Sequence, residues 1–540
     1  MQNIIIKNTL MFFLMMVCNV SYGQLFQNLL LGNAKAISLG NAVTADPPGI
    51  DAIHFNPAGL TRLKGRQYEL KIIAGDISLT GEFQANNQEF KDDIAAKGFT
   101  DPLANTSSTI DKFAVYLPGG GHTALPVLAA PLGGVSYNRK GSKFTFANAV
   151  YAPMIFGMTR KDDDPGIVYG KEFSISRITY LSPSVGYELT DRISIGFSVG
   201  LSYVGLGAVL PFRSPSLLVQ ELTTLTNQVC GRTEADRYVL EVPGLDLCGG
   251  ELDPFQTIFD VEIGVETMAS PTYNLGALWD VTDWLTLGIA YQSEAADVLK
   301  GPISLGLSSN FHPWVVGISE SEPFGIEGLL DTIVKEAIDI PDDGVISRIG
   351  KVKLITPQHL ALGISVQALP KLKINFDVKW TETSKWDTLT FDFGEDIGLI
   401  VLLSLIGIEG ADYDKLVIPR FYEDTVNWGI GFEYDYSPKL SLRLGYEPRK
   451  TGIPDDKKDF LVPLGDIDII ALGFSYRLAK ERTFDFAFFQ IKHDDFIETG
   501  TSTNGNDTRL QNFLYNPTAG LDTKLSLTVT VIEMSYRKSF

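Results

Sequence analysis

The sequence predicts an all-β protein, a transmembrane antiparallel β-barrel of about 14 strands with an N-terminal plug, the hatch, inside its lumen. Three observations predict it. Apolar and polar residues alternate with a period of two in most segments after residue 65, as they do in strands. Short and long connections follow one another between these segments, as in outer-membrane barrels. The segment before residue 66 is rich in small residues and lacks the alternation.

The alternation is clearest in residues 192–206. Ile193, Ile195 and Phe197 fall on one face, and Ser194 and Gly196 fall on the other. A soluble β-sandwich has strands of this kind too, so alternation alone leaves both architectures open. The connection lengths favour the barrel, because tight turns and long loops follow each other strictly.

The expected strands are spread over the whole chain after the hatch. They lie near residues 66–83, 127–138, 143–158, 172–189, 192–210, 267–281, 284–299, 358–369, 371–393, 423–435, 439–450, 464–479, 482–496 and 523–540. The long connections include residues 84–126, 211–266 and 300–357. An even number of strands places both chain ends on the periplasmic side, from which the hatch can fold into the lumen.

The first 23 residues have the features of a cleaved secretory signal. Lys7 gives the positive region, residues 10–17 are apolar, and Ser21 and Gly23 are small residues before the expected cleavage site. After them no apolar run reaches the roughly 18–20 residues that a membrane helix needs. A membrane location therefore requires a barrel, and we expect the outer membrane of a Gram-negative bacterium.

Composition excludes several function classes. The net charge of −20 argues against nucleic acid as a partner. The five histidines are scattered without metal-ligand spacing, and no serine stands out as a partner for His359, which we expect to face the lumen. We therefore expect no catalytic residues, no metal site, no cofactor and no enzymatic activity.

The expected domains are the signal (residues 1–23), the hatch (24–65) and the barrel with its long loops (66–540). Within the hatch, Ala34, Ala36 and Ile37 fit one short helix, and Asp51 fits the N-cap of a second helical turn. The hatch ends in Phe55-Asn56-Pro57-Ala58. This sequence taken alone also fits a simple helix-ending turn.

The hatch motif and a series of strand motifs resemble the FadL family of outer-membrane transporters of long-chain fatty acids and other hydrophobic compounds. Asn56-Pro57-Ala58 follows a small-residue run, and the strand motifs occur in order over nearly the whole chain after the signal. They are residues 151–157, 181–187, 191–196, 287–293, 380–384, 442–446 and 452–455. Thr383 departs from the pattern, since an aromatic residue is often found there.

The resemblance implies capture of a hydrophobic ligand at outer loops, movement of the hatch, and lateral exit through the barrel wall. It gives Phe55, Asn56, Pro57 and Ala58 a role in gating. A general or structural porin remains the alternative. The terminal Phe540 on an alternating last strand resembles the signal read by the barrel assembly machinery. We expect that machinery and outer-membrane lipids as partners of a monomer.

Two long loops contain helical patterns whose apolar residues could form the capture site. An alternative is that each helix packs on its own loop. The capture-loop residues are Leu218, Leu222 and Leu225 in the first loop and Ile326, Leu330 and Ile333 in the second. Lys379 and Arg420 are candidates to meet a ligand carboxylate, or they form lumen ion pairs, with Asp377 available to Lys379.

Two further expectations concern the wall and the loops. Pro153 removes a hydrogen-bond donor within a strand, and Gly157 lowers the bulk nearby. This predicts either a simple bulge or, by resemblance to a kinked third strand of the family, a gap for lateral exit.

Cys230 and Cys248 are expected to form a disulfide, because an exported chain passes into an oxidising compartment. Two buried thiols are the alternative.

Overall fold

A closed antiparallel barrel of 14 strands forms the body of the protein. The computed structural model describes residues 33–125, 128–230, 248–319, 341–397, 400, 404, 410–462, 465–508 and 516–540. The expected signal lies outside the described residues, as do residues 24–32 of the hatch. The last strand closes the barrel by pairing with the first, from Gln67 opposite Ser539 to Gln84 opposite Asp522.

The wall strands follow one another in chain order, and several are interrupted, so that two labels share one position. They are β1 (Gly65–Gln84), β5 (Leu128–Asn138), β6 (Phe144–Thr159), β7 with β8 (Glu172–Leu181 and Ser184–Glu188), β9 (Ile193–Phe212), β10 (Phe259–Thr282), β11 with β12 (Leu285–Gln292 and Ala295–Leu307), β13 with β14 (Val345–Thr356 and His359–Leu369), β15 with β16 (Leu372–Thr381 and Thr388–Asp392), β18 with β19 (Lys415–Pro419 and Thr425–Ser437), β20 (Leu440–Arg449), β21 (Ile467–Ala479), β22 (Arg482–Ile497) and β23 (Asp522–Ser539).

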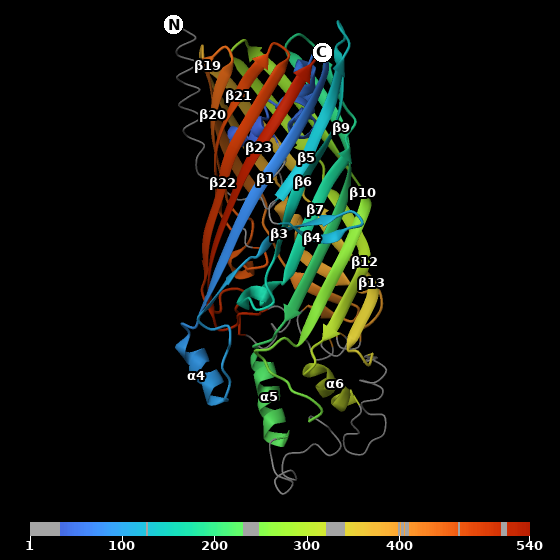
Figure 1. The fold of residues 1–540 in the computed structure, drawn as a ribbon, viewed down its shortest axis with the longest axis vertical. Helices are drawn as coiled ribbons and strands as arrows, with labels where there is room; N and C mark the ends of the chain where they lie inside the picture. Colours follow the sequence, from blue (N-terminus) through green and yellow to red (C-terminus); the bar gives the residue numbers. More distant parts are fainter. Residues whose placement is uncertain are drawn as a thin grey trace.

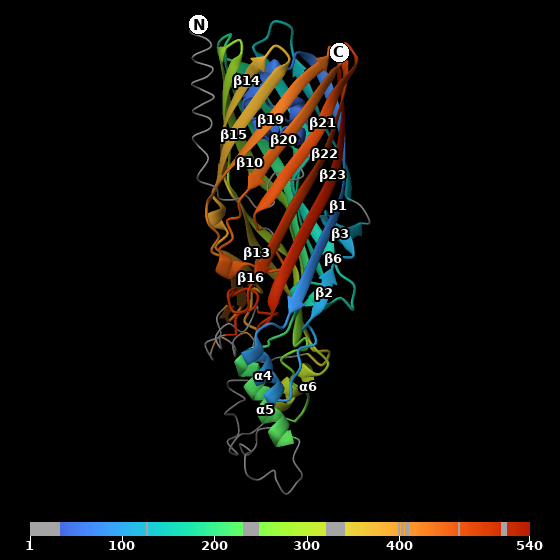
Figure 2. The same ribbon diagram turned by 90° about the vertical axis from the view of Figure 1, so that its left-hand side faces the viewer.

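The two ends of the barrel differ (Figures 1 and 2). The hatch end holds the C-terminus and the tight turns. The loop end carries the helices α4 (Gln88–Ala96), α5 (Leu217–Cys230) and α6 (Phe311–Ser319). None of the helices in the described residues is long and apolar enough to cross a membrane.

The described part of the hatch lies inside the barrel as short helical pieces, drawn in blue in Figure 1. They are α2 (Ala34–Ser38), η1 (Gly49–Asp51), α3 (Ala52–Phe55) and η2 (Pro57–Arg62). Asn33 caps α2, because its side chain accepts a hydrogen bond from the Ala36 N–H at 3.0 Å. Asp51 stands at the N-cap position of α3, as predicted, but its side chain makes no capping hydrogen bond. Its carboxylate binds Asn33 and Lys71 instead.

Three of the expected long loops contain strand that the prediction missed. β10 begins at Phe259, and β12 and β13 pair from Ala295–Thr356 to Gly306–Val345 within the expected loop 300–357. The expected loop 84–126 contains α4 and the short strands β2 (Thr106–Thr109), β3 (Lys112–Leu117) and β4 (Gly121–Leu125). The start of β10 and the end of β13 do alternate, but with the apolar residues facing the lumen and the polar ones facing outward, which is the reverse of the apolar band.

The outer surface shows this band. Near the hatch end, large apolar side chains point outward, including Leu70, Leu362 and Ile470, which are 61%, 51% and 56% exposed. Further toward the loop end, outward positions of the same sheet become polar, such as Glu82 and Lys492. An outward apolar band of limited height is the signature of a barrel that spans a membrane.

The polarity of the lumen changes along the barrel in the direction opposite to that of the outer surface. Around the hatch it is lined by buried charged side chains, which include Lys71, Asp377 and Glu447. Toward the loop end it is lined by one apolar cluster. Members of this cluster are Leu79, Phe83, Phe173, Ile175, Leu206, Leu210, Ile263, Leu305, Leu354 and Phe391.

Candidate functional site

Inward-facing glycines of the wall let the hatch approach the strands closely. A Cβ at Gly134 would lie 2.7 Å from Ile50 Cγ2, and one at Gly186 would lie 2.9 Å from Leu60 Cβ, both closer than real Cβ atoms approach. We call the wall glycines of this kind the glycine belt. Its members are Gly134, Gly186, Gly196, Gly276, Gly288, Gly363, Gly429, Gly445 and Gly473. Glycine in a strand marks such close approaches.

Several members of the glycine belt are paired with each other across neighbouring strands. Gly186 pairs with Gly196, and Gly196 pairs with Gly276. Gly288 pairs with Gly363 in the same way. The hatch is therefore seated against many strands at one level of the wall.

Asn56 lies at the centre of the hatch contacts and is fully buried. Its side-chain oxygen accepts a hydrogen bond from the Ala58 N–H at 3.1 Å, and its amide nitrogen donates to the Thr44 carbonyl at 2.8 Å. The same nitrogen reaches two wall carbonyls, those of Ala277 at 3.2 Å and Ile289 at 3.3 Å. Asn56 thus ties two parts of the hatch to each other and to the wall.

Pro57 and Phe55 complete this turn. Pro57 is the first residue of η2, where its missing N–H costs nothing. It presses against Gly196, where a side chain would overlap the Pro57 backbone. The Phe55 ring packs edge-on against His54, with ring centroids 5.5 Å apart.

Buried ion pairs also join the hatch to the wall. Asp46 of the hatch accepts from Lys35 at 2.8 Å and from Lys373 of β15 at 3.0 Å. Burial alone would raise the pKa of Asp46, but the two lysines hold this pKa well below its usual range. Asp51 binds Lys71 of β1 at 2.7 Å. Removing one partner of such a pair leaves an uncompensated buried charge.

The two head-group candidates lie in different places. Lys379 is buried among the charged residues around the hatch and contacts Glu447 at 2.8 Å. Its ion-pair partner is Glu447 rather than the expected Asp377, whose carboxylate accepts from Thr44 of the hatch. Arg420 is also buried and paired, with Asp459, but it lines a cavity in the apolar lumen.

This lumen cavity has a volume of about 500 Å³. Most of its inner lining is aliphatic or aromatic, and its side toward β16 includes Trp386, which stacks on Tyr422 with ring centroids 6.1 Å apart. Its inner lining includes Phe173, Ile175, Leu206, Leu210, Ile263, Leu354 and Phe391. A concave apolar site with a few polar groups is the usual form of a small-molecule site.

The wall is interrupted at Pro153. The pairing of β5 with β6 runs from Asn138–Thr145 to Gly133–Val150 and goes no further. On the other side of β6, the pairing with β7 shifts register between Tyr151 and Met154. Pro153 therefore lies in a bulge, at the point where β6 separates from β5.

The hairpin of β3 and β4 lies in this interruption. A Cβ at Gly157 would overlap the Ala114 carbonyl oxygen of β3. The Tyr116 N–H donates to Ser176 Oγ of β7 at 3.0 Å, and the Tyr116 ring leaves no room for a Cβ at Gly207 of β9. Gly157 is thus the position at which the hairpin crosses β6.

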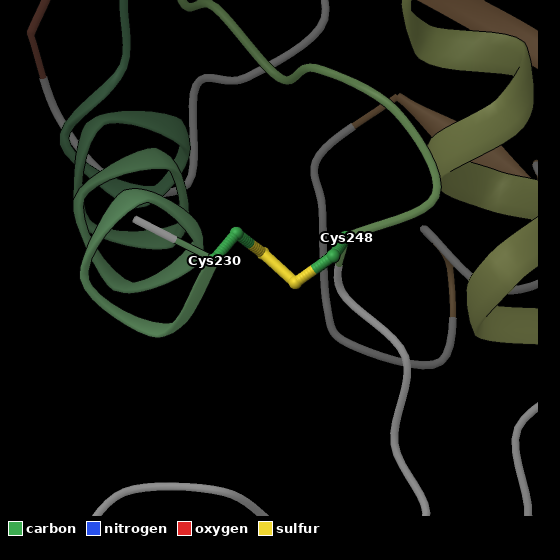
Figure 3. Close-up of a disulfide and its surroundings, with 2 residues drawn as sticks. All are labelled: Cys230 and Cys248. Atoms are coloured by element: carbon green, nitrogen blue, oxygen red, sulfur yellow. A yellow bond between two sulfur atoms is a disulfide. The ribbon is translucent and has the colours of Figure 1, made fainter. Parts of the chain in front are cut away.

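The first predicted capture loop forms α5. Leu222 and Leu225 are 36% and 39% exposed at the loop end, while the side chain of Leu218 lies outside the described residues. Ile326, Leu330 and Ile333 of the second loop lie outside the described residues too. The predicted disulfide is present: Cys230 at the end of α5 is bonded to Cys248 (Figure 3).

The histidines within the described residues serve packing and hydrogen bonding. His359 is buried in the lumen and lies 2.8 Å from the Thr381 hydroxyl. His54 is buried in the hatch and contacts Gln292 of β11. In the described part of the chain no group of three or more His, Cys, Asp or Glu side chains could hold a metal ion.

Comparison with known proteins identifies the family. The model of the family described as outer membrane protein transport protein (OMPP1/FadL/TodX) matches residues 23–540. The chain belongs to this family. The OMPP1/FadL/TodX family consists of transport proteins of the outer membrane rather than enzymes.

Individual relatives are distant. A curated outer membrane protein of Neisseria meningitidis serogroup B is 22% identical over 44% of this chain and 45% of its own length, so the match spans less than half of that relative. A Pseudomonas aeruginosa FadL homologue of known structure aligns with a TM-score of 0.66 at 18% identity, over 95% of this chain and 99% of that one. The Pseudomonas putida toluene transporter TodX aligns with a TM-score of 0.57 at 16% identity, over 96% and 100%. These structures have the same fold as this member of the OMPP1/FadL/TodX family.

The family resemblance implied an apolar pocket in the lumen of this OMPP1/FadL/TodX protein, but sequence reasoning missed the glycine belt and most of the residues that line the lumen cavity. A signal for the glycine belt was present, because glycines recur on the face of each strand opposite the large apolar residues. The sequence contains a weaker signal for the residues that line the cavity. Trp386 belongs to the segment 382–387, whose residues break the alternation inside the expected strand 371–393.

Proposed function

We propose that this protein takes up hydrophobic compounds across the outer membrane of a Gram-negative bacterium. The observation that carries the proposal is the division of the lumen, in which an apolar cavity of about 500 Å³ lies beyond a charged layer sealed by the hatch. Each CH₂ that leaves water contributes roughly 0.8 kcal/mol. An apolar ligand therefore gains from the cavity, whereas small polar solutes meet a closed hatch.

Capture begins at the loop end. The exposed Leu222 and Leu225 of α5 offer an apolar surface beside the mouth of the barrel, and Leu218 of the same helix is proposed to take part in capture. Ile326, Leu330 and Ile333 are proposed to supply the facing surface. From there the ligand moves into the lumen cavity.

The ligand is a long-chain fatty acid or a related hydrophobic compound. Arg420 lines the cavity and is proposed to contact a carboxylate head group. Lys379 is proposed as a second contact for the head group, closer to the hatch. TodX and TbuX are toluene transporters by name, which adds aromatic hydrocarbons to the compounds to test. A cavity lined mainly by aliphatic and aromatic side chains suits both classes.

Movement of the hatch at Phe55, Asn56, Pro57 and Ala58 opens the route past the charged layer. The ligand then leaves sideways between β5 and β6, beside Pro153 and Gly157. The break in pairing after Val150 supports this path. A lateral path keeps the apolar chain out of water, because it passes from the lumen directly into the bilayer.

Uptake of oleate and of toluene tests the proposal, in cells that lack other uptake proteins for these compounds. Cells producing the protein should accumulate one or both faster than vector controls. Rates no higher than those of the vector controls, for oleate and for toluene alike, would refute the proposed function.

A general or structural porin is the alternative class. The protein with and without residues 24–63 is compared in planar bilayers and in liposome swelling with sugars. The proposal expects low conductance and little swelling for the intact chain, and a large conductance after the deletion. A porin conducts well when intact.

A further inference from the structure

A second interruption of the wall lies between β13 and β16, across the barrel from β6. The strands β14 and β15 pair regularly up to His359 and Thr381, and β13 and β16 pair only at Lys351–Asp392 and Val352–Phe391. Between these pairings, residues 353–358 of one strand face the longer segment 382–390 of the other. The extra residues leave the ladder as a short helical turn, η7 (Thr383–Lys385).

Trp386 holds this interruption in place. Its indole N–H donates to the Ile355 carbonyl at 2.5 Å and so takes an acceptor that a regular ladder would give to a backbone N–H. Its ring stacks on Tyr422 from the next strand position. Trp386 is half-buried, and its satisfied N–H together with the stacked ring fixes its orientation in the interruption.

The lumen cavity opens through this interruption. Its lining includes Leu354 and Phe391, which face the lumen and are 5% and 2% exposed. It also includes Val298 and Lys353, which lie on the outer face of the wall, and Val298 is 50% exposed. A cavity lined by both faces of the same wall passes through it.

The outer mouth lies just beyond the apolar band. Tyr291 donates from its hydroxyl to Gln358 at 2.7 Å, and Gln358 donates to Glu382 at 2.7 Å. This polar chain follows the outward Trp380 and marks the edge of the band, since aromatic residues gather at membrane–water interfaces. Val298 and Lys353 come next along their strands, so the mouth faces the head-group region of the outer leaflet.

Positively charged side chains gather at the outer mouth of the cavity. The lysines Lys351, Lys353 and Lys385 all line it, although the net charge of the chain is −20. Lys385 lies 3.8 Å from Glu294 and 3.9 Å from Glu382. Among the described residues Lys351 and Lys353 have no ion-pair partner, and the carboxylates of Asp387 and Asp392 also lie in the lining.

We propose that this opening is a lateral entrance. It admits an amphiphile with an apolar chain and an anionic head group, a long-chain carboxylate, from the outer membrane surface into the lumen cavity. The chain passes between Val298 and Thr388 while the head group meets Lys351 and Lys353. The inference rests on the proposed uptake of hydrophobic compounds and adds a route and a head-group charge to it.

Occupancy of the mouth is tested without transport. Thr390 lines the cavity, and the mature chain has no free thiol because its two cysteines are joined. In isolated outer membranes, dodecanoate should slow the reaction of a maleimide with Thr390→Cys at least threefold. It should leave Thr528→Cys unaffected, a matched position on the outer side of β23 opposite Lys492. Adding Lys353→Glu to Thr390→Cys should abolish the protection.

The route is tested with the same two variants. Modification of Thr390→Cys with a bulky maleimide should lower oleate uptake at least fivefold, and modification of Thr528→Cys should not change it. Parent-rate uptake through the blocked variant would overturn the lateral entrance. If the parent takes up neither oleate nor toluene, the proposed function fails, and the protection experiment then decides whether the mouth binds carboxylates. Equal labelling rates with and without dodecanoate would overturn the inference by themselves.

Discussion

Asn56 of the hatch and Gly276 of the wall fit together so closely that a Cβ at position 276 would overlap the Asn56 side-chain oxygen. The same side chain bonds to the carbonyl of Ala277, the next residue of β10. The hatch is therefore seated both by hydrogen bonds and by the absence of side chains in the wall. This pairing makes the seal testable from either side.

From the wall side, Gly276→Ala should displace the hatch. The added methyl group has no free space, so the hatch shifts while the strand ladder is kept. We expect higher single-channel conductance and greater sensitivity of cells to bulky antibiotics, with unchanged heat-modifiability of the barrel. Gly306→Ala is the control, because the nearest atom to its Cβ would lie 3.9 Å away. Equal conductance of both variants would count against the glycine belt as a seal.

From the hatch side, Asn56→Ala should loosen the same contact. The change leaves the Ala58 N–H and buried carbonyls without their partner, and an unsatisfied buried group costs about 1–3 kcal/mol. We expect reduced uptake or an increased leak from a barrel that still assembles. Asn86→Ala, which removes a contact with Asp522 at the loop end, is the control. Unchanged uptake together with unchanged conductance would remove Asn56 from the gating mechanism.

The fold was largely predictable because strand alternation and turn length are local properties. Residues 192–206 alternate over the segment that becomes most of β9, and the expected turn between β22 and β21 lies near 479–482. In the missed strand segment Val345–Thr356, Lys351 and Lys353 face outward and Val352 and Leu354 face the lumen, so the alternation is the reverse of that in the apolar band.

The site was less predictable because its parts come from distant positions in the chain. The sequence singled out Arg420 as a cation but gave no sign that it would line a cavity with Phe173 and Leu461. It indicated that Pro153 interrupts a strand, which it does, but not that β3 would cross at Gly157. Such contacts depend on strand order and register, which a local pattern does not contain.

The disulfide should matter to the loops and not to the barrel. In the chain-entropy model a loop closed across 18 residues gains about 3 kcal/mol. Cys230→Ser with Cys248→Ser should therefore speed proteolysis near α5 and leave the thermal unfolding of the barrel unchanged. Limited proteolysis and heat-modifiability measure the two effects. A large fall in barrel stability would show that the loop supports the wall.

Arg420 should discriminate between ligand classes. Because Arg420 and Asp459 are buried together, the test variant changes both, as Arg420→Met with Asp459→Asn, so that no lone charge remains. Uptake of oleate should fall about tenfold, the factor that corresponds to 1.4 kcal/mol, and uptake of toluene should be kept. Lys379→Met with Glu447→Gln is the matched pair nearer the hatch. Equal loss of both compounds would assign Arg420 a structural role.

Lateral exit makes the sharpest prediction, and it concerns Gly157. A side chain there must displace the Ala114 carbonyl of β3 or the Phe173 carbonyl, which would lie 2.8 Å from the new Cβ. Gly157→Val therefore forces the β3–β4 hairpin away from its crossing of β6 and changes the packing beside Pro153, where the ligand is proposed to leave. We expect a folded barrel whose bilayer conductance equals that of the parent and whose rate of ligand uptake is well below that of the parent. Replacing Pro153 with valine, which can donate to a ladder, should act in the same direction.

The control is Gly120→Ala in the turn of the same hairpin, where the nearest atom would lie 3.6 Å from the Cβ. It changes the hairpin without filling the crossing and should transport normally. Heat-modifiability and bilayer conductance separate a blocked exit from a misfolded wall. If folded Gly157→Val and Pro153→Val variants both transport at the parent rate, the ligand does not leave between β5 and β6. It must then pass the hatch into the periplasm, and variants of Asn56 and Gly276 will control the rate of uptake.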